Sequence, residues 1–166
     1  KRWRPEAIRM FMFTSHYSNP IVFSEEALDA SVKGWERLSG AARLTRSLLA
    51  DAPEGDAANA ILAEVDKTRV DFAAAMDDDF NAPVALSALQ TFTREVNTLL
   101  NSDVAVGQHV LEQIDGVYRD LGGTVLGIIG SFDVLGTTGI DHPEAVTAGI
   151  AQALITTATG LGIAIF

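Results

Sequence analysis

Residues 77–100 read DDDFNAPVALSALQTFTREVNTLL, and this stretch decides how the chain folds. The three aspartates end one amphipathic segment, and the side chain of Asn81 is suited to cap the helix that follows. Pro83 suits the first turn of that helix, where a backbone N–H has no helical partner. Apolar residues then recur at helical spacing, as Val84, Leu86, Leu89, Phe92, Val96, Leu99 and Leu100. The stretch therefore predicts a helix with one buried face, ending at residues 101–102.

Helical patterns extend in both directions from this stretch. Ser24 and Asp103 are the expected caps of two further helices, and Gly122 with Gly123 is the expected stop of the last one. The loop 51–56 contains Pro, Gly and two Asp residues. Besides the helix after Asn81, we expect helices at about residues 5–16, 24–50, 57–76 and 103–121. The fold class predicted is mainly α: an antiparallel helical bundle followed by a hydrophobic helical hairpin.

Charge divides the chain into two parts of different physical kind. The 166 residues carry a formal net charge of −10, but the segment from Leu121 to Phe166 contains only Asp133, Asp141 and Glu144 as charged residues. The acidic balance argues against nonspecific binding to nucleic acid, although Lys1, Arg2, Arg4 and Arg9 form one basic cluster. The absence of cysteine excludes disulfides, thiol nucleophiles and cysteine-ligated metals.

The apolar end of the chain allows two interpretations. Residues 146–166 form a run of 21 residues without a charge, which is long enough to cross a bilayer core of about 30 Å. Gln152 and four threonines lower its hydrophobicity, so a buried core helix is the alternative.

The run Asp77–Asp79 also has two interpretations. Clustered carboxylates bind hard cations, but three consecutive residues cannot all face one ion on a regular element. Helix termination, followed by capping of the helix that contains Pro83, is therefore favoured over a metal site.

Three strings resemble cysteinyl-tRNA synthetases: RPEAIRMFMFTSHYSNPIVFSEEAL at residues 4–28, MDDDFNAPVAL at 76–86 with REVN at 94–97, and YRDLGG at 118–123. The resemblance implies a cytoplasmic ligase that attaches cysteine to tRNA(Cys) with ATP and contains zinc. Residues 1–23 would then be the linker and first helix after the catalytic domain, and residues 24–121 a tRNA-side helical bundle. The family's nucleotide signatures and zinc ligands would precede Lys1, so we expect this chain to have no catalytic residue, bind no cofactor or metal and leave cysteine unactivated.

The same resemblance makes Arg4, Arg9, His16 and Tyr17 candidate ATP or tRNA contacts, because this segment follows the ATP-binding signature in the family. His16 and Tyr17 can act as a base with its partner, as a stacking pair for a nucleotide, or simply pack at a helix end. Ser18 stands where the family usually has arginine, which weakens an expected phosphate or tRNA contact.

The strings GTVLGIIGSF at residues 123–132 and GIAQALITTATGLGIAI at 149–165 resemble the end of the MotA/TolQ/ExbB proton-channel family. This resemblance implies an apolar channel-like tail at 122–166, membrane association of 124–166 in the inner membrane, and a partner that bears an aspartate. Thr124 and Thr157 would line the pore, although threonine hydroxyls often bond to their own helix. Gln152 replaces a glutamate common in the family. We hypothesise a chimeric or truncated chain; a helical scaffold without its own activity is a third alternative.

Overall fold

The computed structural model describes residues 3–123, which form helices and turns and contain no strand. The predicted mainly α class is therefore confirmed for this part. The elements are α1 (Pro5–Met12), α2 (Glu25–Leu49), the short η1 (Asn59–Ile61), α3 (Leu62–Asp77), α4 (Ala82–Leu100), α5 (Gln108–Val117) and one π-helical turn, η2 (Tyr118–Gly122). The expected hydrophobic hairpin, its apolar run 146–166 and the pore candidates Thr124 and Thr157 lie outside the described residues.

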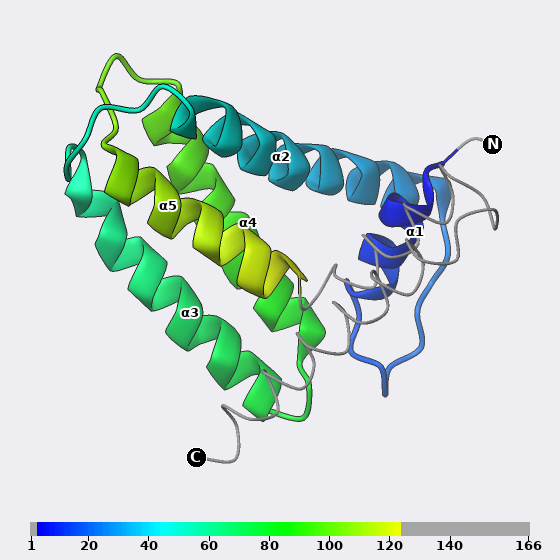
Figure 1. Cartoon of the computed structure of the whole chain (residues 1–166). Helices are drawn as coiled ribbons and strands as arrows, with labels where there is room; N and C mark the ends of the chain where they lie inside the picture. Colours follow the sequence, from blue (N-terminus) through cyan, green and yellow to red (C-terminus); the bar gives the residue numbers. More distant parts are fainter. Residues whose placement is uncertain (1–2, 124–166) are drawn as a thin grey trace, which may run out of the picture. The chain divides into compact units, whose positions relative to one another are not determined.

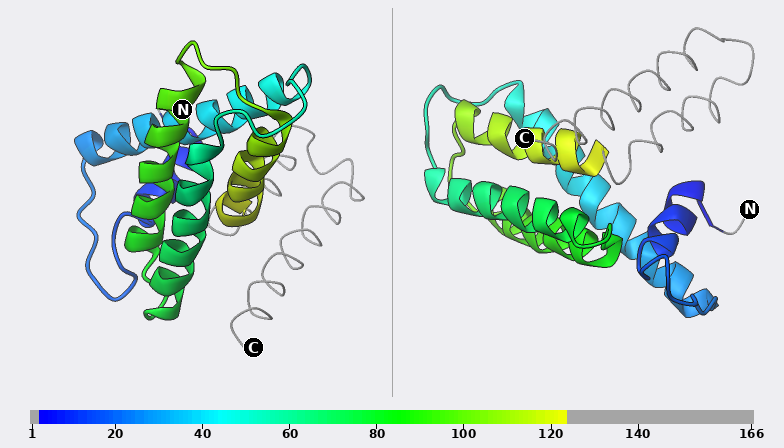
Figure 2. Two further views of the ribbon diagram at one scale, coloured as in Figure 1. Left: turned by 90° about the vertical axis from the view of Figure 1, so that its left-hand side faces the viewer. Right: turned by 90° about the horizontal axis from the view of Figure 1, so that it is seen from below.

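The chain divides into two compact units, residues 1–118 and 119–166. Within the first unit, α3 packs beside α4 and beside α5, α2 packs across α4 and α5, and α1 packs on α2 (Figures 1 and 2). Short turns reverse the chain between α3 and α4, as expected for an antiparallel bundle. Among residues 3–123, no helix combines the length and the hydrophobicity that crossing a bilayer requires.

Ser24 caps α2 as the sequence predicts. Its hydroxyl accepts the backbone N–H of Ala27 at 3.1 Å, which satisfies one of the N–H groups left unpaired at the start of a helix. Glu25 and Glu26 occupy the first turn, where the positive end of the helix dipole favours carboxylates.

The first helix ends earlier than predicted, and α4 begins directly after Asn81 as predicted but without the expected side-chain cap. The helix α1 ends at Met12 rather than His16, because the carbonyl of Phe11 is taken by the backbone N–H of Thr14 at 3.0 Å and by its hydroxyl at 2.7 Å. Asn81 precedes α4, but its side chain makes no cap; it donates instead to the carboxylate of Asp78 at 3.3 Å.

The start of the fifth helix was also predicted wrongly. Asp103 does not cap α5, which begins at Gln108 with Gly107 before it. The N–H of Gly107 donates to the carbonyl of Ala57 at 3.0 Å, and the N–H of Gln108 donates to Pro53 at 2.8 Å. These bonds to the loop before α3 hold the preceding segment out of the helix, so tertiary contacts override the capping signal.

The core lies where α4 and α5 meet the other helices. The fully buried side chains include Leu89, Phe92, Val96, Val110, Leu111, Ile114 and Val117, together with Met10 and Leu28 near α1. The predicted buried face of α4 is confirmed at Leu86, Leu89, Phe92 and Val96, whereas Val84 is 51% exposed. Leu99 and Leu100, at the end of the helix, are half-buried. Periodicity missed buried hydroxyl residues: Thr45 and Thr93 donate to the carbonyls of Ala41 at 2.9 Å and Leu89 at 2.7 Å, one turn earlier.

Tyr118 ends this core, with its ring centroid 5.5 Å from that of Phe92 and its hydroxyl 3.4 Å from the hydroxyl of Thr93. Burial raises the pKa of Tyr118 to about 12, against a smaller opposing effect of the bond with Thr93. Because the phenol ionises near pH 10 when unfolded, its contribution to stability is complete below pH 10. That contribution is lost as the pH rises toward 12.

We therefore expect the wild-type protein to lose about 2–3 kcal/mol of unfolding free energy between pH 9 and pH 12 through this residue. The variant Tyr118→Phe lacks the ionising group and should lose correspondingly less. Urea unfolding of both proteins across this pH range, followed by circular dichroism of the helices, measures the two unfolding free energies. Their difference isolates Tyr118, because the other titrating groups are the same in both proteins. Parallel stability curves would contradict the assignment.

Candidate functional site

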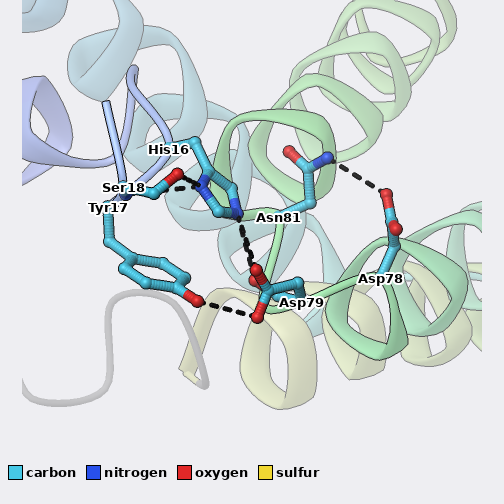
Figure 3. A network of polar contacts seen from close by, with 6 residues as sticks. All are labelled: His16, Tyr17, Ser18, Asp78, Asp79 and Asn81. Atoms are coloured by element: carbon cyan, nitrogen blue, oxygen red, sulfur yellow. Dashed lines mark hydrogen bonds and ion pairs between the residues drawn. The ribbon is translucent and has the colours of Figure 1, made fainter. Parts of the chain in front are cut away.

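The connection after α1 and the turn between α3 and α4 meet in a polar cluster (Figure 3). We call His16, Tyr17, Ser18 and Asp79 the His16–Asp79 cluster. The structure brings the candidates His16 and Tyr17 together with an aspartate more than sixty positions later in the chain.

His16 uses both ring nitrogens in this cluster. Its Nε2 lies 3.1 Å from the backbone carbonyl oxygen of Asp79, and its Nδ1 lies 2.6 Å from Oγ of Ser18. A carbonyl oxygen only accepts, so Nε2 donates to it. The backbone N–H of Ser18 donates to Nδ1 at 3.4 Å, so Nδ1 acts as an acceptor. With both nitrogens engaged, the ring bridges two segments and leaves no nitrogen open to take a proton from a substrate.

Tyr17 is placed to present its ring to solvent. Its hydroxyl donates to Oδ1 of Asp79 at 2.7 Å, and this bond to the aspartate, with smaller effects of desolvation and of the aspartate charge, raises the pKa of Tyr17. The ring centroid lies 4.5 Å from that of His16 at an interplanar angle of 33°. Because Tyr17 is 71% exposed, one flat aromatic surface is accessible to a ligand.

The backbone of the turn orients Asp79. Both Asp79 and Phe80 have φ of +53°, in the left-handed region that aspartate tolerates and phenylalanine rarely adopts. The N–H groups of Phe80 and Asn81 donate to Met76 at 3.1 Å and Ala75 at 2.9 Å, which ends α3. The turn thereby directs the carbonyl and the carboxylate of Asp79 toward the connection after α1 (Figure 3).

The predicted termination of a helix at Asp77–Asp79 is thus confirmed, with Asp77 the last residue of α3. The carboxylates of this run turn to separate partners, Asp78 to Asn81 and Asp79 to Tyr17. Within residues 3–123, no three histidine or carboxylate side chains lie close enough together to hold a metal ion.

The two arginine candidates lie apart from the cluster on α1. Arg4 occupies the N-cap position and is exposed, whereas Arg9 is half-buried in the last turn. Asp79 itself was missed as a site residue by sequence reasoning. One signal could have indicated it. The strings that contain His16 and Asp79 resemble the same family, which links these two segments although they lie far apart in the sequence.

The Tyr17–Asp79 bond should hold the connection after α1 against the α3–α4 turn. We expect Tyr17→Phe to leave the global unfolding free energy within about 0.5 kcal/mol, because the bond is exposed. Amide exchange of residues 14–19 should become a few-fold faster, since local opening loses one charge-assisted bond. Hydrogen–deuterium exchange with mass spectrometry measures this effect. Ser39→Ala, which removes an exposed hydroxyl from α2, is the control, and unchanged exchange in the connection would contradict the expectation.

Comparison with known proteins gives one family match and several relatives. Residues 71–130 match the family model described as the DALR domain. The chain is 36% identical over 141 residues to a cysteine–tRNA ligase of Moorella thermoacetica, covering 78% of this chain and 29% of the relative. It is 33% identical over 148 residues to the cysteine–tRNA ligase of Deinococcus radiodurans, covering 89% of this chain and 29% of the relative. The chain thus spans about 29% of the length of these relatives.

These similarities support the resemblance to the C-terminal helical segment of cysteinyl-tRNA synthetases and give no support to a proton channel. The DALR match continues to residue 130 and so includes part of the string assigned to the channel family. A cysteine–tRNA ligase of Thioalkalivibrio sulfidiphilus aligns with 92% of this chain at 36% identity, so the alignment reaches at least to about residue 153. The ligase similarity therefore does not stop at residue 121.

Proposed function

We propose that this chain is the C-terminal helical part of a cysteine–tRNA ligase and that its bundle supports the binding of tRNA(Cys). The observation that carries the proposal is the similarity to cysteine–tRNA ligases, which extends over 78% and 89% of the chain in two relatives. In the parent ligase, ATP and zinc would be held by parts outside this chain, in the cytoplasm.

The described fold supports a binding role rather than a chemical one. Each predicted site residue in the His16–Asp79 cluster is occupied by bonds that join two segments, and Tyr17 remains exposed as a surface for stacking. We propose Tyr17 and Arg4 as contacts to ATP or tRNA at this end of the bundle, with Arg9 behind them on α1. We also propose that residues 1–23 connect a catalytic domain to a bundle at 24–121, with 122–166 as a separate segment.

Direct binding tests this function. The purified chain is titrated against a labelled tRNA(Cys) transcript at 100 mM KCl, and fluorescence anisotropy reports the complex. We expect a dissociation constant in the micromolar range, on the order of 10⁻⁶ to 10⁻⁵ M, with affinity falling as salt rises. A chain of net charge −10 that is only a scaffold would show no saturable binding, and that result would overturn the proposal.

A further inference from the structure

A groove lies between α2 and α4, and both polar and apolar residues line it. It has a volume of about 310 Å³, and its lining includes Gly34 and Arg37 of α2 with Gln90, Arg94, Asn97 and Thr98 of α4. Gly34 keeps the groove open: a Cβ there would lie 3.0 Å from Nε2 of Gln90 and 3.1 Å from Cε of Met10.

The charge of this groove is opposite to that of the chain. Arg37 and Arg94 are exposed, and no carboxylate residue is among the lining residues, although the net charge of the chain is −10. Neither guanidinium has an ion pair or hydrogen bond within residues 3–123, so both can bind a ligand without losing a protein partner.

A second hollow along α4 provides an internal comparison. The hollow between α3 and α4 is lined by Glu64, Asp71 and Asp78 with Lys67 as its cation. Lys67 lies 3.3 Å from the carboxylate of Asp71 and 4.0 Å from that of Glu64, so its charge is already paired. Of these two hollows along α4, only the groove toward α2 offers unpaired positive charge from the residues that the structure describes.

We infer that the groove between α2 and α4 binds the ribose–phosphate backbone of RNA, an inference that rests on the proposed function and names the face it uses. The planar guanidinium groups of Arg37 and Arg94 match phosphate oxygens in two-point contacts. The side chains of Gln90, Asn97 and Thr98 supply amide and hydroxyl groups for ribose hydroxyls and phosphates.

The dimensions of the groove suit this ligand. The α4 residues that line it extend from Gln90 to Thr98, a rise of about 12 Å along the helix axis, which accommodates more than one phosphate group. Contacts to the backbone position an RNA without reading its bases. The groove should therefore contribute the same affinity to cognate and non-cognate tRNA.

The test measures binding of the full chain to a labelled tRNA(Cys) transcript at several KCl concentrations. We expect about fivefold weaker binding for Arg37→Ala and for Arg94→Ala, and at least tenfold weaker binding for the double variant. The slope of log affinity against log salt should fall by about 0.7–0.9 for each contact removed. A non-cognate tRNA should lose affinity by the same factor.

The control is the double variant Arg43→Ala with Lys67→Ala, which removes the same charge from exposed positions outside the groove. Gln substitutions at Arg37 and Arg94, which keep the side-chain stem, should reproduce the alanine results, and circular dichroism verifies folding. If the groove and control variants lose equal tRNA affinity, the groove is not the binding site, while the proposed function remains intact. A wild-type chain that does not bind tRNA would overturn both.

An acidic peptide is the other anion that two arginines can bind, and a poly-glutamate peptide serves as its probe. RNA is favoured because four of the five α4 residues that line the groove carry amide or hydroxyl groups, which suit ribose. If the groove variants lose poly-glutamate binding but bind tRNA as the wild type does, the inference is wrong.

Discussion

Replacement of Gly107 by alanine is expected to reduce the unfolding free energy by about 3 kcal/mol or more. A Cβ at this position would lie 2.7 Å from the backbone nitrogen of Ala57 and closer still to the carbonyl oxygen of Gly55. Backbone atoms cannot rotate away as a flexible side chain can, so the two loops would have to separate. Separation breaks the bonds from Gly107 to Ala57 and from Gln108 to Pro53, leaving their groups unpaired.

The requirement for glycine here is spatial and not conformational, because the φ of Gly107 is −71°, which any residue adopts. The matched control is Gly40→Ala in the middle of α2, where a Cβ would meet no atom within 4 Å. Alanine favours the helix there, so stability should increase by about 0.5–1 kcal/mol. Urea unfolding of both variants measures the two effects, and effects of equal sign would refute the spatial explanation.

Truncation of Phe92 to alanine should cost about 3–5 kcal/mol of unfolding free energy. The residue is 0% exposed, and its ring centroid lies 5.5 Å from that of Tyr118, the first residue of η2. Removal of the ring forfeits the transfer of its apolar surface from water and leaves a cavity that a packed core closes only in part. The unfolding free energy of a whole domain is typically about 5–15 kcal/mol, so this single change should remove a large fraction of it.

Phe80→Ala is the control for this truncation. Phe80 is 61% exposed, and alanine meets the same left-handed backbone as phenylalanine, so we expect a change within about 0.5 kcal/mol. Urea midpoints followed by circular dichroism at 222 nm compare the two variants under identical conditions. A loss at Phe92 below 1 kcal/mol would show that this side chain does not lie in a tightly packed core.

The sequence predicted the parts of the fold that depend on local physics. Apolar residues at helical spacing identified the buried face of α4 around Leu89, Phe92 and Val96, because burial of that face stabilises the helix. The hydroxyl of Ser24 marked the start of α2 for the same local reason. Buried hydroxyl residues such as Thr45 were missed, since a hydroxyl bonded within its own helix packs like an apolar group.

The remainder depends on contacts between distant segments. Asp103 has a good capping side chain, yet the helix starts later because Gly107 bonds to the loop before α3. His16 and Tyr17 were identified as candidates, but their partner Asp79 lies 62 and 63 positions away. No periodicity relates such positions, so the geometry of the candidate site required the structure.

The long separation between Tyr17 and Asp79 also sets the order in which the molecule assembles. Closing a flexible loop of this length would cost about 3–4 kcal/mol in chain entropy, more than one exposed hydrogen bond returns. We therefore expect the bond to form only after α2, α3 and α4 have packed and brought its ends together. The His16–Asp79 cluster would then form late in folding and indicate that the bundle is already packed.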